Sequence, residues 1–150
     1  MQEIRSNIKI YSKSDIAMQY LNLALSEYVK GQNMFAVIHL AGAAEELLGQ
    51  IVYINTRENA LSRDQQSMRS WYAILEKNTP SNKELNDRIF LKAKNGIKHI
   101  NKKDPADLEI EIDLLREAKE VIRRAIENFN QIPELKYSDE LIAYHEHEKT

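Results

Sequence analysis

The sequence contains no cysteine. This absence excludes a disulfide framework, a thiol nucleophile and a thiolate-bound zinc site, and it is compatible with a reducing cytosol. Glycine and proline are also scarce, with four and three residues in a chain of 150. Little material therefore remains for β-turns or disordered linkers, and the composition favours long helices.

Charge and hydropathy narrow the range of partners. The formal net charge is −2, which excludes the globally basic balance of a protein whose whole surface engages duplex DNA but leaves room for a local basic patch. The N-terminus lacks the unbroken apolar core of a signal peptide, and no apolar run approaches the roughly 20 residues that span a bilayer. We therefore expect a cytoplasmic protein without a membrane partner.

Apolar residues recur at helical spacing along most of the chain, and no segment shows the alternation of a strand. Capping residues and helix breakers divide this pattern into five helices: Ser14 to Gly31, Asn33 to between Asn55 and Asn59, Ser62 to about residue 77, Ser81 to about residue 100, and Asp104 to about residue 131. Residues 133–150 form either a short helix after Ser138 or a flexible tail. The sequence predicts one all-α domain, 1–150, built as a four- to five-helix bundle with its core between residues 14 and 131.

The stretch FLKAKNGIKHINKKD, residues 90–104, interrupts this apolar rhythm with cations and amides. Asn95 and His99 are four residues apart and share a helical face, whereas Lys94 lies about 140° round from His99. The three side chains converge only where the helix bends or ends, and Gly96 makes bending easier. Lys and His in a last turn are also what the helix dipole favours. The stretch is therefore either a plain helix end or a cationic site for an anion.

The second helix is apolar on most sides, so we expect it to be the most buried, yet it carries two adjacent carboxylates, Glu45 and Glu46. His39 shares a face with Glu46, and small residues, Gly42 and Ala43, lie between them. An unpaired buried carboxylate costs several kcal/mol, so at least one of the two must find a partner or solvent. The alternatives are a ligand site and a close helix–helix contact in which a carboxylate bridges to Lys or Arg.

Taken together, the two stretches resemble the HEPN superfamily, all-α domains of prokaryotic toxins, RNA-processing factors and defence systems. In many members the second helix reads approximately His-Ala-Gln-Gln-Ala-Ala-Glu, and residues 39–45 here read His-Leu-Ala-Gly-Ala-Ala-Glu. The family's site motif has Arg, a polar residue that is often Asn, and then His. Residues 94–99, Lys-Asn-Gly-Ile-Lys-His, are similar to it at the shortest spacing. A long final helix follows in both, and the resemblance covers roughly residues 14 to 131.

The resemblance implies metal-independent cleavage of RNA by attack of its own 2′-hydroxyl, in a homodimer whose two motifs face each other across a cleft. Such chemistry needs cations that hold the scissile phosphate and a group that moves protons near pH 7. The catalytic candidates are Lys94, Asn95 and His99, with Glu45 orienting one of them. The candidates for binding are Lys98, Lys102, Glu46 and His39. No cofactor is implied.

The departure from the family pattern is Lys94 in place of Arg. A lysine supplies charge but lacks the planar fork that fixes the orientation of a phosphate. We therefore expect the site to bind RNA or a nucleotide even if it no longer cleaves RNA. A rival hypothesis is a non-catalytic helical interaction protein of a toxin or defence-type system, which docks a protein partner on the small-residue face of the second helix. A small-molecule pocket between the second and fourth helices has no specific support.

Two other signals carry less weight. His145-Glu146-His147 resembles a metal-ligand tract, but residues two apart diverge on a helix and no third ligand lies nearby in the sequence, so we expect a solvated tail and no metal site. Trp71, the only tryptophan, lies outside any basic cluster. It is expected in the core or in a dimer contact rather than in a platform for base stacking.

Overall fold

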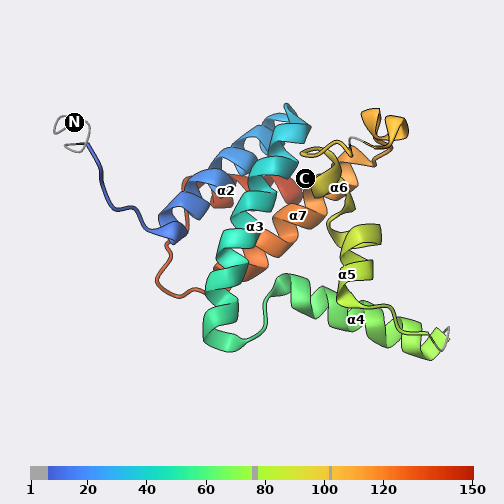
Figure 1. The fold of residues 1–150 in the computed structure, drawn as a ribbon. Helices are drawn as coiled ribbons and strands as arrows, with labels where there is room; N and C mark the ends of the chain where they lie inside the picture. Colours follow the sequence, from blue (N-terminus) through green and yellow to red (C-terminus); the bar gives the residue numbers. More distant parts are fainter. Residues whose placement is uncertain (1–6, 76–77, 102) are drawn as a thin grey trace.

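The computed structural model describes residues 7–75, 78–101 and 103–150, and the regular structure of these residues is entirely helical (Figure 1). The elements are α2 (Lys13–Lys30), α3 (Met34–Thr56), α4 (Ala60–Leu75), α5 (Asn82–Leu85), the π-helical η1 (Asn86–Phe90), α6 (Lys92–Gly96), the 3₁₀-helical η2 (Pro105–Leu108), α7 (Leu114–Asn130) and α8 (Asp139–Glu148). The all-α prediction is confirmed. The segments outnumber the four or five helices expected, because two of the expected helices are broken and the tail forms a helix.

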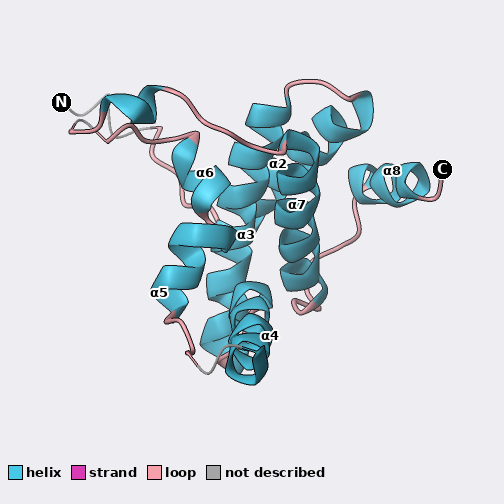
Figure 2. Cartoon of the chain, turned by 90° about the vertical axis from the view of Figure 1, so that its right-hand side faces the viewer, coloured by secondary structure: helices cyan, strands magenta, loops and turns pink. Residues whose placement is uncertain are grey.

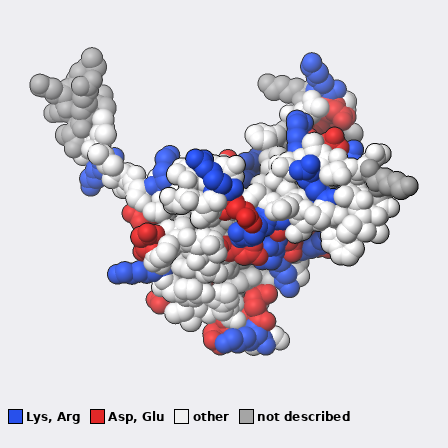
Figure 3. All heavy atoms as spheres, turned by 90° about the horizontal axis from the view of Figure 1, so that it is seen from below, with Lys and Arg blue, Asp and Glu red and all other residues white. Residues whose placement is uncertain are grey.

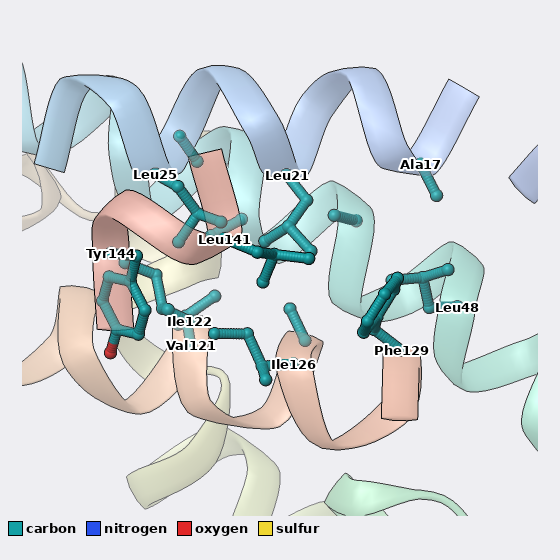
Figure 4. Close-up of a cluster of buried hydrophobic side chains, with 14 of the residues drawn as sticks. Ala17, Leu21, Leu25, Leu48, Val121, Ile122, Ile126, Phe129, Leu141 and Tyr144 are labelled. Carbon is teal, nitrogen blue, oxygen red and sulfur yellow. The ribbon is translucent and has the colours of Figure 1, made fainter. Parts of the chain in front are cut away.

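The core lies between α2, α3, α7 and α8 (Figures 2 and 4). On α7, the predicted apolar stripe is buried because its members recur every three or four residues and so share one face. Figure 4 shows side chains from all four helices pointing into the same space: Leu21, Leu25, Leu48, Val121, Ile122, Ile126, Phe129, Leu141 and Tyr144. Apolar burial therefore organises these four helices around one core.

α2 begins slightly earlier than expected. Ser12 rather than Ser14 occupies the N-cap position, and its hydroxyl oxygen accepts a hydrogen bond from the backbone N–H of Asp15 at 3.1 Å. The helix ends as predicted at Gly31, which adopts a left-handed conformation with φ of 69°. A residue without Cβ takes that conformation at no steric cost, so its N–H can close the last turn of the helix.

α3 occupies the centre of the bundle, as its apolar composition predicts. It is also the one helix in the described part of the chain that is long and apolar enough to cross a bilayer, so the expectation that no run approaches that length was too strict. Half of the stretch is buried among the other helices, and central helices of helical bundles share this composition. Length and composition alone are therefore weak evidence for a membrane span.

α4 starts at a different capping pair from the one predicted. The expected box joined Ser62 to Gln65, whereas the structure joins Asn59 to Ser62: the Asn59 Oδ1 accepts from the Ser62 N–H at 3.0 Å, and the Ser62 Oγ accepts from the Asn59 N–H at 2.8 Å. The expected end at residues 76 and 77 lies outside the described residues. α4 projects from the bundle, and Trp71 is 61% exposed, so it is not a core residue (Figure 1).

Residues 81–100 do not form the continuous helix that was predicted. The Ser81 cap is confirmed, since its Oγ accepts from the Glu84 N–H at 3.2 Å. After α5, however, the chain widens into the π-helical η1 and leaves helical geometry at Leu91, with φ of −114°. The carbonyl oxygen of Phe90 accepts from Arg124 Nη2 of α7 at 3.3 Å. This tertiary hydrogen bond accompanies the break, and α6 follows as a separate short helix.

The long final helix begins nine residues later than Pro105, at Leu114. Asp104 does cap the chain, but only the 3₁₀ turn η2 follows it. Residues 109–113 are not helical, and α7 starts after a second cap at Asp113, whose Oδ1 accepts from the Arg116 N–H. Leu-Glu-Ile-Glu-Ile, residues 108–112, alternates apolar and charged side chains, which favours extended backbone over a helix.

The tail forms a helix that belongs to the core. Ser138 caps α8 as predicted, because its Oγ accepts from the Leu141 N–H at 3.2 Å. Leu141 and Tyr144 are buried against α2, and the Tyr28 hydroxyl donates to Glu148 Oε1 at 3.1 Å. The buried core therefore extends beyond residue 131, where it was expected to end.

Candidate functional site

A polar cavity of about 330 Å³ lies where α3, α4, α6 and α7 meet. Its walls are formed by Glu45, Glu46, Gly49, Gln50, Asn59, Leu61, Leu91, Lys94, Asn95, Lys98 and Asn128. Five of the residues singled out in the sequence are among them, two from α3 and three from α6 and the turn after it. The break at Leu91 matters here, because it turns α6 toward α3 and brings this part of the basic segment to the cavity.

Lys94 is only 6% exposed, which is unusual for a lysine. Its aliphatic chain lies against α3 at Gly42, where an added Cβ would stand 3.0 Å from both Lys94 Cδ and Cε. The ammonium Nζ then donates to Glu46 Oε2 at 3.1 Å. Because the Glu46 side chain is 65% exposed, the ion pair joins a buried cation to a carboxylate at the cavity's solvent side.

Glu45 points to a different partner. Its Oε1 accepts from Arg124 Nε of α7 at 2.9 Å, and both side chains are almost fully buried. Its Oε2 is also buried and has no hydrogen-bond partner among the described residues. Both carboxylates of α3 thus bridge to a cation on another helix, as the helix-contact alternative described. Glu45 faces Arg124 rather than Lys94, so it does not orient the basic segment by a direct contact.

The two histidines of the predicted site do not line this cavity. His99 directly follows the turn after α6, its N–H donates to the Asn95 carbonyl oxygen at 3.1 Å, and its side chain is exposed. His39 is exposed on α3. Lys98 is exposed and lines the cavity without an ion-pair partner among the described residues. Lys102 lies outside the described residues.

Sequence reasoning missed two residues that complete the site, Arg124 and Asn128. The Asn128 carboxamide donates to the Glu45 carbonyl oxygen at 3.2 Å and accepts from the Ala60 N–H at 2.9 Å, so it links α3 to the start of α4. Both residues sit on the buried face of α7 beside Val121 and Ala125. Polar residues inside an otherwise apolar stripe were the available signal, since buried polar groups require partners.

A second group of charges lies beside the cavity, between α4 and α7. Arg123 bonds to Asp64 through Nη2 at 2.6 Å and to Glu127 through Nη1 at 2.6 Å. Burial lowers the pKa of Arg123, but the hydrogen bonds that Arg123 donates to these carboxylates and to Glu120 outweigh it and raise the pKa overall. In Figure 3, acidic and basic side chains alternate where α4 joins the bundle. These charges neutralise one another and fix the base of α4.

The His145–His147 tract lies against aromatic rings of the α2–α8 contact. His145 stacks on Tyr137 with ring centroids 5.9 Å apart, and His147 meets the edge of Tyr28 at 5.9 Å. His145 is half-buried, whereas Glu146 and His147 are exposed as expected of a solvated segment, so the tract is helical and only partly packed against the fold. In the described residues, no three His, Asp or Glu side chains gather closely enough to hold a metal ion.

Comparisons with protein-family models, curated proteins and solved structures gave no match to this chain.

Proposed function

We propose that the chain is a HEPN-like helical domain that binds RNA or a nucleotide in the cavity between α3, α4, α6 and α7. One observation carries the proposal: Lys94, Asn95 and Lys98 line the same cavity as Glu45 and Glu46. Both halves of the resemblance, on the second helix and on the basic segment, thus contribute to one hollow of the surface. The polar lining and small volume suit a ligand rich in hydrogen-bonding groups.

Each of these side chains has a capacity for hydrogen bonding that the fold leaves open. Lys98 offers an exposed ammonium to a phosphate, and the Asn95 carboxamide has no side-chain hydrogen bond among the described residues. Lys94 uses one of its three N–H donors on Glu46 and keeps two for a ligand. Phosphate binding by lysine rests on charge rather than on fixed bidentate geometry.

Within one chain, we propose binding rather than cleavage. Cleavage requires a proton-transfer group within hydrogen-bond reach of the scissile phosphodiester, and His99 does not line the cavity that contains Lys94. A homodimer, which the family resemblance implies, would have to supply the histidine from the second copy. We extend the proposal to such a homodimer in the cytoplasm.

The test is binding and cleavage of a mixed pool of labelled single-stranded and structured RNA. Lys98→Ala should weaken binding and reduce the steepness of its salt dependence by about 0.7, because one phosphate contact is lost. Lys136→Ala removes an exposed lysine that does not line the cavity and serves as the matched control. Equal losses from both variants would sink the proposed site.

Cleavage is tested with His99→Ala and Lys94→Arg in the same assay. Binding without cleavage in all three proteins supports the binding function. Cleavage that disappears in His99→Ala and rises in Lys94→Arg would instead establish the ribonuclease. Absence of both binding and cleavage would move the assignment to an interaction protein.

A second candidate function, the non-catalytic interaction protein, is favoured by the outer face of α4. Trp71, Ile74 and Leu75 are 61%, 75% and 70% exposed, and much of the α4 lobe on the right of Figure 3 is uncharged. Two copies can meet on such a face without repulsion between like charges, in a two-fold symmetric contact. The small-residue face of α3 is less suitable for docking a protein partner than expected, because the Lys94 side chain covers Gly42.

This candidate is tested by measuring molar mass in solution. Trp71→Ser together with Ile74→Ser should convert a dimer to a monomer while leaving the melting temperature nearly unchanged. A chain that is monomeric at all concentrations would exclude the α4 contact between copies.

A further inference from the structure

The Lys94–Glu46 ion pair displays an ordered set of hydrogen-bonding groups in the cavity. Lys94 Nζ, with two N–H donors still unused, stands 3.1 Å from Glu46 Oε2, and Glu46 Oε1 comes next. Among the described residues, Oε1 has no hydrogen-bond partner, and Oε2 accepts only from Lys94. Along the cavity wall the pair therefore presents a donor, an acceptor and a second acceptor.

Guanine has the complementary edge. Its O6 accepts a hydrogen bond, and its N1–H and N2–H₂ groups donate, so the Watson–Crick edge reads acceptor, donor, donor. We propose that the cavity selects a guanine base, with O6 on Lys94 Nζ and the two N–H groups on the carboxylate of Glu46. This inference rests on the proposed function, since it names the nucleotide that the RNA- or nucleotide-binding site takes. The ion pair need not separate, because Lys94 and Glu46 bind the base with the hydrogen-bond donors and acceptors that they do not use on each other.

The rest of the cavity fits one nucleotide. A volume of about 330 Å³ is at the small end of ligand pockets, which limits the occupant to a single unit. Leu61 of α4 and Leu91 before α6 supply apolar contact to the faces of a base. Lys98 is left to meet the phosphate. Single-stranded RNA is commonly recognised in this manner, by bases turned out of the stack and bonded along their Watson–Crick edges.

A further acceptor without a donor lies in the same wall. Glu45 also lines the cavity, is 3% exposed and keeps its Oε2 without a partner among the described residues. A buried carboxylate oxygen without a donor is costly, and together with Glu46 Oε1 it makes two carboxylate oxygens of α3 that lack a donor among the described residues. Of the two carboxylates, the exposed Glu46 is the one that a ligand edge with two adjacent donors can satisfy, and guanine is the one standard base with two adjacent donors on its Watson–Crick edge.

The other bases leave groups unpaired on this wall. Uracil and cytosine each place an O2 acceptor opposite Glu46 Oε1, and adenine and cytosine place an amino donor opposite Lys94. Mismatched donors and acceptors typically cost a factor of about 10 or more in affinity. The expected order is guanine first, with the other three well below it.

The first experiment is calorimetric titration of the full chain with GMP, AMP, CMP and UMP, beside single-stranded RNA. GMP binding tighter by about 10-fold or more supports the inference. Equal affinity for the four nucleotides overturns guanine selection but leaves the proposed function standing. No binding of any nucleotide or of RNA overturns both.

The second experiment changes the order of groups on the wall. Glu46→Gln keeps the shape but presents a donor, an acceptor and a donor, because the amide oxygen stays toward the Lys94 ammonium. That order complements uracil, so UMP should gain on GMP in this variant. Glu134→Gln makes the same charge change at an exposed loop position that does not line the cavity, and it should keep the GMP preference.

If Glu46→Gln kept the full preference for GMP, Glu46 would not be the group that distinguishes guanine from the other bases, and the inference would be overturned. If Glu46→Gln fails to fold by circular dichroism, Glu46→Asp replaces it. Asp keeps both acceptors but withdraws them by one methylene, so GMP should bind more weakly without any gain for UMP. Unchanged GMP affinity in Glu46→Asp overturns the inference.

Discussion

Apolar packing dominates the contacts among α2, α3, α7 and α8, where the buried Glu45–Arg124 pair and Asn128 are the polar exceptions, whereas mainly polar contacts attach α4, η1 and α6 to that bundle. The buried residues of α2 are all apolar except for the tyrosine hydroxyl, while α4 buries only Ala60 and Gln65. Gln65 donates to Asn86 Oδ1 of η1 at 2.8 Å, and Asp64 bonds to Arg123 of α7. The described structure therefore combines two modes of assembly in one chain.

The difference explains where the cavity lies. Apolar side chains fill space to nearly crystalline density, so the four-helix bundle leaves little room for a ligand. Hydrogen bonds and ion pairs fix directions without filling volume, so a hollow remains along the boundary between the two regions. The cavity walls come from both regions: α3 and α7 supply the buried carboxylate and amide, and α6 with the turn after it supplies the cations.

The largest expected effect comes from the buried ion pair at that boundary. Arg124→Met leaves the Glu45 carboxylate buried without its partner, and unfolding in urea should show a loss of about 3–5 kcal/mol. The double variant with Glu45→Met should recover most of that loss, because no charge remains buried. Arg123→Met, at the more exposed cluster, should cost about 1 kcal/mol or less. Equal losses of unfolding free energy in Arg124→Met and Arg123→Met would contradict the contrast between the buried ion pair and the exposed cluster.

The next effect compares apolar side chains of the two regions. Leu141→Ala removes a fully buried side chain of α8 and should cost about 2–5 kcal/mol. Trp71→Ala, on the exposed face of α4, should change stability by about 0.5 kcal/mol or less despite the larger side chain. Thermal or urea unfolding of the two variants measures the difference. A large loss for Trp71→Ala would show that α4 packs in solution.

Alkaline pH should loosen the α2–α8 contact. Burial and the charge of Glu148 raise the pKa of Tyr144 to about 12, and burial with the Glu148 hydrogen bond raises the pKa of Tyr28 as well. A raised pKa in the folded state means that the neutral phenol is favoured, so the contribution is complete below pH 10 and is lost above it.

For Tyr144 the loss should reach about 2 kcal/mol by pH 12. The measurement is the free energy of unfolding from pH 9 to 12. Tyr144→Phe should flatten the curve, and a wild-type curve that is already flat would refute the assignment.

The smallest effect on stability is expected at Gly42. An added methyl group would stand 3.0 Å from the Lys94 side chain, so that flexible chain must shift out of its place on α3. Alanine favours a helix over glycine by about 1 kcal/mol, which should offset the displacement. Gly42→Ala should therefore melt near the wild-type temperature but bind RNA several-fold more weakly. If Gly42→Ala bound RNA with wild-type affinity, the position of the Lys94 side chain would not matter for binding.

Local signals in the sequence predicted much of the bundle. Ser81 and Ser138 cap the helices that they were expected to cap, and α3 is central because its composition leaves no polar face. Such features depend on side chains within a few residues, so a single sequence contains the information needed.

The errors arose where distant contacts decide the local structure. α6 ends at Gly96, where the sequence allowed a bend or an end, but no local pattern showed that the missing Cβ admits Ile110, whose Cδ1 would lie 2.6 Å from an added methyl carbon. Residues 109–113, which include Ile110, are not helical, although Pro105 signals a helix start. The partners of Glu45 and Lys94 likewise come from pairings between helices that no local pattern specifies.

Asn128 gives the molecule a mechanical property. Its one carboxamide joins the Glu45 carbonyl oxygen to the first N–H of α4, a helix of 16 residues or about 24 Å. Asn128 therefore holds the base of α4 together with the Asp64–Arg123 and Gln65–Asn86 contacts, and a tilt of about 10° about that base would carry the far end of α4 through roughly 4 Å. Asn128 and Leu61 both line the cavity, so a ligand that displaces either side chain would also move α4 and, with it, the exposed Trp71 near the far end of that helix.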